Sequence, residues 1–243
     1  MQQRRPVLSP RFEARIAGFL YLLVILLGGF AEIGIRQGLV TAGDPAATAQ
    51  AIVAHEDFFR LGFGAEMMTN VIAVPLTLIL YRLLAPAGRF MVLLAVVLDL
   101  TQNTINAMNA WTQFAPLTLL NGSPDLAAIP PAELAALARL ALKWHDVGFQ
   151  IGLTFFGFAL LIYGGVIFRS GFFPRFIGLL YGLAGACYLV NSYACFLAPG
   201  LPIQPYILYP CLVGEGAFSL WLLIVGVNEA KWRAAAARAE AAP

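Results

Sequence analysis

The chain has 243 residues, of which 60% are hydrophobic and only 12% are charged, and its formal net charge is +2. A soluble domain has about 25% charged residues, and the mean hydropathy here is +0.79. This composition excludes an ordinary water-facing surface, and the sequence has no basic stripe for nucleic acid, so lipid is the expected solvent.

Six apolar segments are each long enough to cross the bilayer core, which takes about 20 helical residues. In chain order they run from about 15 to 35, 58 to 81, 90 to 117, 142 to 168, 173 to 197 and 206 to 228. The predicted fold is all-α, a polytopic membrane protein with one bundle of six transmembrane helices, residues 15–230. A basic N-terminus, residues 1–14, precedes it, and a tail, residues 231–243, follows. The tail is rich in Ala with alternating charge, which fits either a helical extension or a disordered end.

The Lys and Arg residues predict the orientation, because cytoplasmic loops carry an excess of positive charge. With six spans, eleven of the fifteen lie on the side of the two termini, among them Arg4 and Arg5. The four on the other side are Arg36, Arg60, Arg139 and Lys143. Both termini are therefore expected in the cytoplasm, with short cytoplasmic turns such as that between Arg82 and Arg89.

Two longer loops are expected on the outer side, residues 36–57 and 121–141, and each carries helix signals. Asp44 before Pro45 is typical of a helix N-terminus, so a capped, Ala-rich helix is expected to follow. The Pro-Pro-Ala-Glu sequence that starts at Pro130 predicts a second helix, which has room to run on into the fourth span.

Ionisable and amide side chains interrupt the apolar spans, and each ionised residue costs about 2.5–3.5 kcal/mol to insert. At a rise of about 1.5 Å per residue, these side chains fall in one layer in the outer half of the bilayer. Side chains this polar should face the bundle interior or a wet cavity. The sequence therefore predicts an outward-facing polar ligand pocket. Its expected lining is Glu66, Asn70, Asp99, Asn103, Asn106, His145, Asp146 and Glu215.

The same side chains have plainer interpretations. Amides in membrane helices often join helices through hydrogen bonds of about 0.6 kcal/mol each, whereas Glu66, Asp99 and Glu215 carry carboxyl groups that such joining does not need. His145 also fits a position at the membrane interface. A one-histidine metal site with Glu66, Asp146 and Glu215 is chemically permissible, but its spacing is not diagnostic. No metal is therefore predicted, and any cofactor is left open.

Known catalytic and nucleotide-binding motifs are absent: the sequence has no G-x-x-x-x-G-K-[ST], no H-E-x-x-H and no G-x-S-x-G. The three cysteines, Cys187, Cys195 and Cys211, lack metal-type spacing. A disulfide between Cys195 and Cys211 stays open, because connectivity does not follow from sequence.

Several stretches carry a family resemblance. The first span opens with Arg-Ile-Ala-Gly-Phe-Leu-Tyr from Arg15 and has Glu32 near its end. The third contains Asp-Leu-x-x-Asn from Asp99, and the fifth opens with Phe-Pro-Arg-x-x-Gly from Phe173. In these stretches the chain resembles domain-of-unknown-function family 4386, bacterial multi-pass membrane proteins that are uncharacterised. The resemblance extends to about Lys231. It implies a bacterial inner membrane location and six spans, and it implies no activity.

The polar layer supports three hypotheses of different classes. The first is binding, sensing or transport of a small or amphipathic ligand, with Glu66, Asp99 and Glu215 as polar anchors. The second is a membrane-embedded enzyme that acts on a lipid-like substrate, with His145 and carboxylates as acid and base. The third is a structural or accessory membrane subunit. The expected partners are membrane lipid and a small-molecule or lipid-like ligand, and the oligomeric state is left open.

Overall fold

The computed structural model describes residues 9–201, 203 and 205–241, so the predicted charges Arg4 and Arg5 lie outside the described residues. Every regular element in that part of the chain is helical, which confirms the predicted all-α fold class. The elements are α1 (Pro10–Gly29), the π-helix η1 (Phe30–Arg36), α2 (Gln37–Leu39), α3 (Pro45–Ala54), α4 (Glu56–Leu120), the 3₁₀ turn η2 (Pro124–Leu126), α5 (Pro131–Ser170), α6 (Arg175–Leu197), the 3₁₀ turn η3 (Tyr206–Leu208), α7 (Tyr209–Ile224) and α8 (Glu229–Ala241).

Five helical stretches of the described chain are long and apolar enough to cross a membrane, by length and composition. They are Pro10–Leu39, Glu56–Leu120, Pro131–Ser170, Arg175–Leu197 and Tyr206–Ile224. Large apolar side chains stay exposed along them: Phe90 is 75% exposed, Met108 71% and Ile224 65%. Soluble proteins rarely leave large apolar patches in water, so these faces suit lipid.

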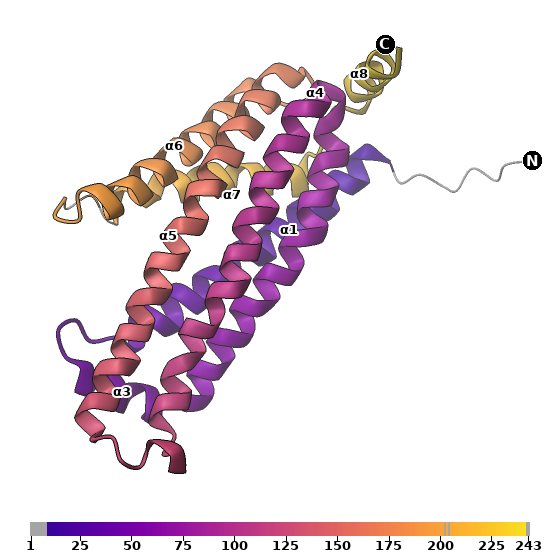
Figure 1. The fold of residues 1–243 in the computed structure, drawn as a ribbon. Helices are drawn as coiled ribbons and strands as arrows, with labels where there is room; N and C mark the ends of the chain where they lie inside the picture. The colour runs from indigo at the N-terminus through magenta and orange to yellow at the C-terminus, as the bar shows by residue number, and fades with distance from the viewer. Residues whose placement is uncertain (1–8, 202, 204, 242–243) are drawn as a thin grey trace, which may run out of the picture. The chain divides into compact units, whose positions relative to one another are not determined.

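The longest stretch, α4, is two helices that meet at Gly88, where the backbone leaves helical geometry with φ 163° and ψ 81°. A straight helix of its length would extend about 100 Å, against about 30 Å for the bilayer core. Figure 1 shows α4 reversing direction instead. Pairs that contact each other lie at similar sequence distances on either side of Gly88, Thr77 with Asp99 and Phe63 with Phe114. The predicted second and third spans are the two arms of this hairpin.

The helix signals of the two expected outer loops are confirmed. The side chain of Asp44 accepts the backbone N–H of Ala47 at 2.9 Å and caps α3. In the second loop α5 begins at Pro131 and continues without interruption to Ser170, so the second loop helix runs on into the fourth span.

The last predicted span ends earlier than expected. Helix α7 stops at Ile224 rather than at Asn228, because Gly226 adopts a left-handed conformation with φ +74° that favours glycine and ends helices. The chain then starts α8 at Glu229, so the tail is helical through Ala241.

Contacts divide the chain into two compact units, and each is described by itself below. Unit 1 comprises residues 1–23, 73–102 and 153–243, and unit 2 comprises residues 24–72 and 103–152. The end of the first apolar helix, the loops before α4 and before α5, and both ends of α4 belong to unit 2, while α6, α7 and α8 belong to unit 1.

A small apolar core fixes the end of the first span in unit 2. Its buried members are Ile35, Leu39, Ile52, Phe59, Leu117 and Leu142. These side chains come from η1, α2, α3, α4 and α5, so apolar burial joins all five elements. The core therefore holds η1, and with it two charged side chains, in a defined position.

In unit 1, α5 and α6 approach each other backbone to backbone at glycines. A Cβ atom added to Gly164 would lie 2.6 Å from the nitrogen of Gly182 and 2.7 Å from the carbonyl oxygen of Gly178. Small residues permit such close packing between membrane helices. The next residue, Gly165, has no atom within 4 Å of an added Cβ, so it tolerates a side chain.

We expect Gly164→Ala to lower the free energy of unfolding by about 1–3 kcal/mol, the usual cost of overpacking a tight contact. Gly165→Ala is the matched control and should unfold like the wild type, apart from a small gain in helix propensity. Reversible unfolding in mixed micelles measures both variants. Equal stability of the two variants would show that α5 and α6 do not pack through Gly164.

Candidate functional site

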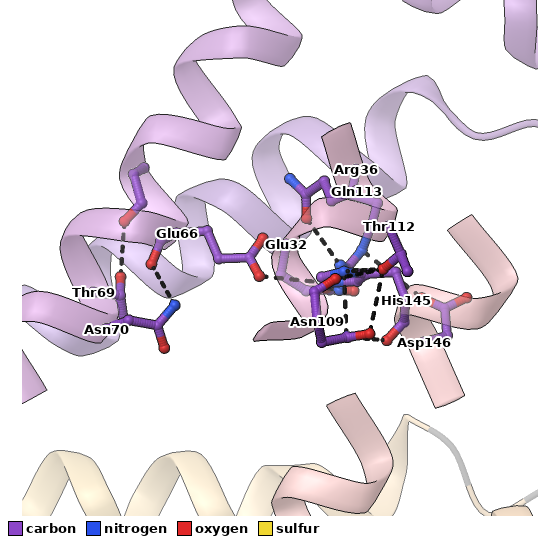
Figure 2. Close-up of polar contacts among 11 residues, drawn as sticks. Glu32, Arg36, Glu66, Thr69, Asn70, Asn109, Thr112, Gln113, His145 and Asp146 are labelled. Atoms are coloured by element: carbon purple, nitrogen blue, oxygen red, sulfur yellow. Dashed lines mark hydrogen bonds and ion pairs between the residues drawn. The ribbon is translucent and has the colours of Figure 1, made fainter. Parts of the chain in front are cut away.

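Unit 2 contains a group of polar and charged side chains that we call the polar cluster. Its members are Glu32, Arg36, Glu66, Asn109, Thr112, Gln113, His145 and Asp146 (Figure 2). They come from η1, from both arms of α4 and from α5. Two of them, Glu32 and Arg36, lie on the π-helix, an irregularity that often occurs at functional sites.

Arg36 is the cation of the polar cluster and is only 7% exposed. Its guanidinium forms an ion pair with Glu32, and its Nη1 donates to Oε1 of Gln113 at 3.2 Å. Its Nε lies 3.9 Å from Oδ1 of Asp146. A buried charge is tolerated only when it is paired and hydrogen-bonded, and here three elements supply the partners. Arg36 therefore links η1 to α4 and α5 within unit 2.

His145 lies beside this pairing and is 1% exposed. Its Nδ1 is 3.3 Å from the hydroxyl of Thr112 and 3.4 Å from the amide nitrogen of Asn109. Asn109 also donates to the carbonyl oxygen of His145 at 2.8 Å. On the opposite side of the ring, Nε2 faces Oε1 of Glu66 at 3.6 Å. A neutral ring with its proton on Nε2 suits both sides, because Nδ1 then accepts and Nε2–H points at a carboxylate.

Glu66 is the least compensated carboxylate of the polar cluster. Its nearest ionic partner among the described residues is His145, at a distance longer than a direct hydrogen bond. Its side chain is 16% exposed, so it is neither sealed in nor fully solvated. Three carboxylates of the cluster thus share one guanidinium, and that guanidinium is engaged with Glu32 and Asp146.

The eight residues predicted to line a pocket are divided between the two units. Asp99 and Glu215 belong to unit 1. The six in unit 2 are Glu66, Asn70, Asn103, Asn106, His145 and Asp146. Of these six, Glu66 lies opposite His145, and Asp146 faces Arg36 in the same cluster.

The three amides among them differ in their contacts. Asn70 donates to the backbone oxygen of Glu66 at 3.1 Å within α4. Asn103 donates across the hairpin to the backbone oxygen of Asn70 at 2.9 Å. Asn106 is buried, and its Oδ1 has no hydrogen-bond partner among the described residues. Asn103 therefore joins the two arms of the hairpin, whereas the side chain of Asn70 bonds within its own helix.

The two carboxyl groups of unit 1 are held by hydroxyl groups. Asp99 accepts a hydrogen bond from Thr77 at 2.8 Å. Glu215 accepts one from Tyr21 at 2.9 Å and a short one from Tyr188 at 2.5 Å. Both acids are 8% exposed.

Sequence reasoning missed Arg36, which it treated only as a charge at the end of the first span. The available signal was Glu32 four residues before it, a spacing that lets the two pair on a helix. It also missed Tyr21 and Tyr188, because buried tyrosines in apolar helices cannot be told from ordinary core residues without knowing which helices are neighbours.

The disulfide and the metal site that were considered from the sequence are not seen in the described part of the chain. All three cysteines are free, with Cys195 exposed and Cys211 buried. In the described part of the chain, no three His, Cys, Asp or Glu side chains are grouped to hold a metal ion. A surface depression of about 320 Å³ in unit 2 is lined by Arg60 and Phe114 but by none of the predicted site residues.

The model of a family described as "Domain of unknown function (DUF4386)" matches residues 16–226. The chain belongs to this family. A relative named "Uncharacterized protein", from Archaeoglobus fulgidus, is 31% identical over 98 residues, which cover 38% of this chain. The matched stretch is 58% of that relative's length. No solved structure matches the chain. The predicted family is thus confirmed, and neither the family's description nor the relative's name states an activity.

Because Arg36 is buried, we expect its replacement to lower the free energy of unfolding. Arg36→Ala removes a buried guanidinium and its hydrogen bond to Gln113. The carboxylates left behind are partly exposed, 36% for Glu32 and 55% for Asp146, so the cost is that of a lost hydrogen bond to a charged group, about 1.5–3 kcal/mol. We expect a loss of unfolding free energy in that range. The matched control is Arg60→Ala in the same unit, because Arg60 pairs with Glu56 at the surface and surface pairs contribute little. Chemical unfolding in detergent measures both, and similar losses would contradict the assigned role of Arg36.

Proposed function

We propose that this chain is a membrane protein that binds a small or amphipathic ligand carrying a positive charge, and that Glu66 in the polar cluster is its anchor. The observation that carries the proposal is the position of Glu66. It faces His145 across 3.6 Å, while the one guanidinium nearby is engaged with two other carboxylates. A carboxylate that lacks a direct ion pair among apolar helices is costly, and a ligand ammonium group would reduce that cost.

Two buried polar atoms of unit 2 support the same proposal. Among the described residues, Nε2 of Gln113 and Oδ1 of Asn106 have no hydrogen-bond partner. Native proteins leave few buried polar atoms unsatisfied. One of these atoms is a donor and the other is an acceptor, and both lie on the second arm of α4, so a ligand with both polar and charged groups would have partners on the two arms of the hairpin. Gln113 is also hydrogen-bonded to Arg36, which links it to the charged centre of the cluster.

A second candidate is an enzyme that acts on a lipid-like substrate. It is favoured by the pairing of His145 with Glu66, because Thr112 and Asn109 hold one ring nitrogen while the other faces a carboxylate. This is the arrangement of a general base with its orienting groups. The imidazole is 1% exposed, so a substrate would need an opening of unit 2 to reach it, and ligand binding at Glu66 ranks first.

A third candidate, an accessory subunit with a purely structural polar layer, is favoured by the hydrogen bond from Asn103 to Asn70. It accounts for the amides but not for Glu66, which has no interhelical hydrogen bond recorded in the described chain. In that case Glu66→Gln would change stability and no small molecule would bind.

The same proposal includes six membrane crossings in a bacterial inner membrane, with both termini in the cytoplasm. The count rests on the two arms of α4 plus the four other apolar helices. The orientation rests on the Lys and Arg residues, eleven of which fall on one side when the count is six.

The ligand prediction uses octylammonium as a probe and octanoate as its counterpart of the same chain length and opposite charge. We expect octylammonium to raise the thermal stability of the purified protein and octanoate not to. Glu66→Gln should weaken octylammonium binding by roughly 30-fold, about 2 kcal/mol, because it removes the charge partner. A thermal shift titration in a neutral detergent measures the affinities, and native mass spectrometry reports any ligand that co-purifies.

Glu56→Gln is the matched control, since Glu56 begins the same helix but pairs with Arg60 at the surface. It should bind octylammonium like the wild type. Equal affinity for octylammonium and octanoate, or wild-type affinity of Glu66→Gln for octylammonium, would contradict the proposal.

The topology prediction is tested by cysteine labelling in a background where the three native cysteines are replaced by serine. Ser123→Cys, in the second outer loop, should react with a membrane-impermeant maleimide in intact cells. Ser170→Cys, at the end of α5, should react only after the cells are broken. The reverse pattern would show that the termini lie outside.

A further inference from the structure

Unit 1 contains a set of buried tyrosine hydroxyl groups and two buried carboxyl groups. The proposed ligand site uses neither the hydroxyl groups nor the carboxyl groups. At one end is Glu215 on α7, with Tyr21 of α1 donating to its Oε2 at 2.9 Å. The hydroxyl of Tyr21 is also 2.8 Å from that of Tyr181 on α6. Tyr21 and Tyr181 are 3% and 2% exposed, so this connection is closed to solvent.

The donors in this connection have a fixed direction. A tyrosine hydroxyl has one proton to donate, and Tyr21 uses its proton on Glu215. Tyr181 must therefore be the donor in the bond to Tyr21. The oxygen of Tyr181 then keeps a lone pair free to accept from a further donor, and the protons along this line all point toward Glu215.

Tyr163 on α5 is placed to be that further donor. It is 1% exposed, and its hydroxyl has no hydrogen-bond partner among the described residues. Its ring lies 6.5 Å from the ring of Tyr181. It also interacts electrostatically with both Tyr181 and Asp99. A buried hydroxyl of this kind is rare, and this one is close enough to interact with both Asp99 and Tyr181.

We propose that unit 1 holds a proton relay in which Asp99 and Glu215 exchange a proton through Tyr163, Tyr181 and Tyr21. When Asp99 gives up its proton, its O–H bond breaks and Tyr163 gains one. Each tyrosine passes its own proton to the next oxygen, so it breaks one O–H bond and forms another and stays neutral. The net change is a carboxylate at Asp99 and a carboxylic acid at Glu215.

The side chains around Asp99 and Glu215 are neutral, so the charge of each acid is balanced by binding a proton. Thr77 donates to Asp99, Tyr188 donates to Glu215, and Cys211 donates to the backbone oxygen of Ala184. None of these groups is a cation, and no ion pair with either acid is recorded in the described part of unit 1. The proposed relay requires a rotation of Tyr163, or one bridging water with several polar partners, to join its hydroxyl to Asp99 and Tyr181.

Infrared spectroscopy of the full chain in lipid bilayers tests the relay. The protonated carboxyl bands are assigned with Asp99→Asn and Glu215→Gln, and deuterium exchange at each is followed after transfer to heavy water. We expect Tyr163→Phe to slow exchange at one of the two carboxyl groups by roughly 100-fold, the scale on which a positioned proton donor acts. The other group, nearer the point of proton entry, should keep its rate.

Tyr163→Phe is the decisive variant because its hydroxyl has no partner in the described chain, so a merely structural role predicts no change. Tyr193→Phe, an exposed position on the same helix as Tyr181, controls for loss of a tyrosine hydroxyl. Unchanged exchange at both carboxyl groups in Tyr163→Phe overturns the relay, as does the absence of any protonated carboxyl band while the protein is folded. No ligand is used, so the result does not depend on Glu66.

Discussion

A polar side chain placed among apolar helices is stabilised chiefly by partners within the protein, and this constraint governs the arrangement of both units. Water is not present in a hydrocarbon layer to satisfy a charge or an amide. Arg36 shows the strongest form of the constraint, because a guanidinium that is 7% exposed is tolerated only with carboxylates and an amide beside it. The π-helix, the hairpin and α5 are each held in part by this pairing.

The two units meet the requirement with different chemistry. The polar cluster of unit 2 combines opposite charges, and its three carboxylates outnumber its one guanidinium, so a negative excess remains at Glu66. Unit 1 surrounds its two acids with neutral hydroxyl groups from Thr77, Tyr21 and Tyr188. The first arrangement suits recognition of a positive ligand, while the second suits the movement of a proton.

Much of the fold follows from hydrophobic length and from local helix chemistry. Asp44-Pro45 predicts the start of α3, and the apolar segments predict the long helices, because these signals act over a few residues. The identity of the polar partners did not follow, since Tyr21 meets Glu215 from almost two hundred positions away. Asp99 and Glu66 stand out in the sequence because a carboxyl group in an apolar helix costs free energy. That cost does not show which helix supplies the partner, nor that the two residues belong to different units.

The hairpin at Gly88 also bears on how the chain enters the membrane. During synthesis the first arm of α4 leaves the ribosome before the second, which carries Asp99, Asn103 and Asn109. On the first arm, Thr77 donates a hydrogen bond to Asp99, and the backbone oxygen of Asn70 accepts one from Asn103. The second arm alone would leave Asp99 and Asn103 without these partners, whereas a hairpin enters an apolar environment with both already hydrogen-bonded. Asn109 finds its partner only when His145 of α5 arrives.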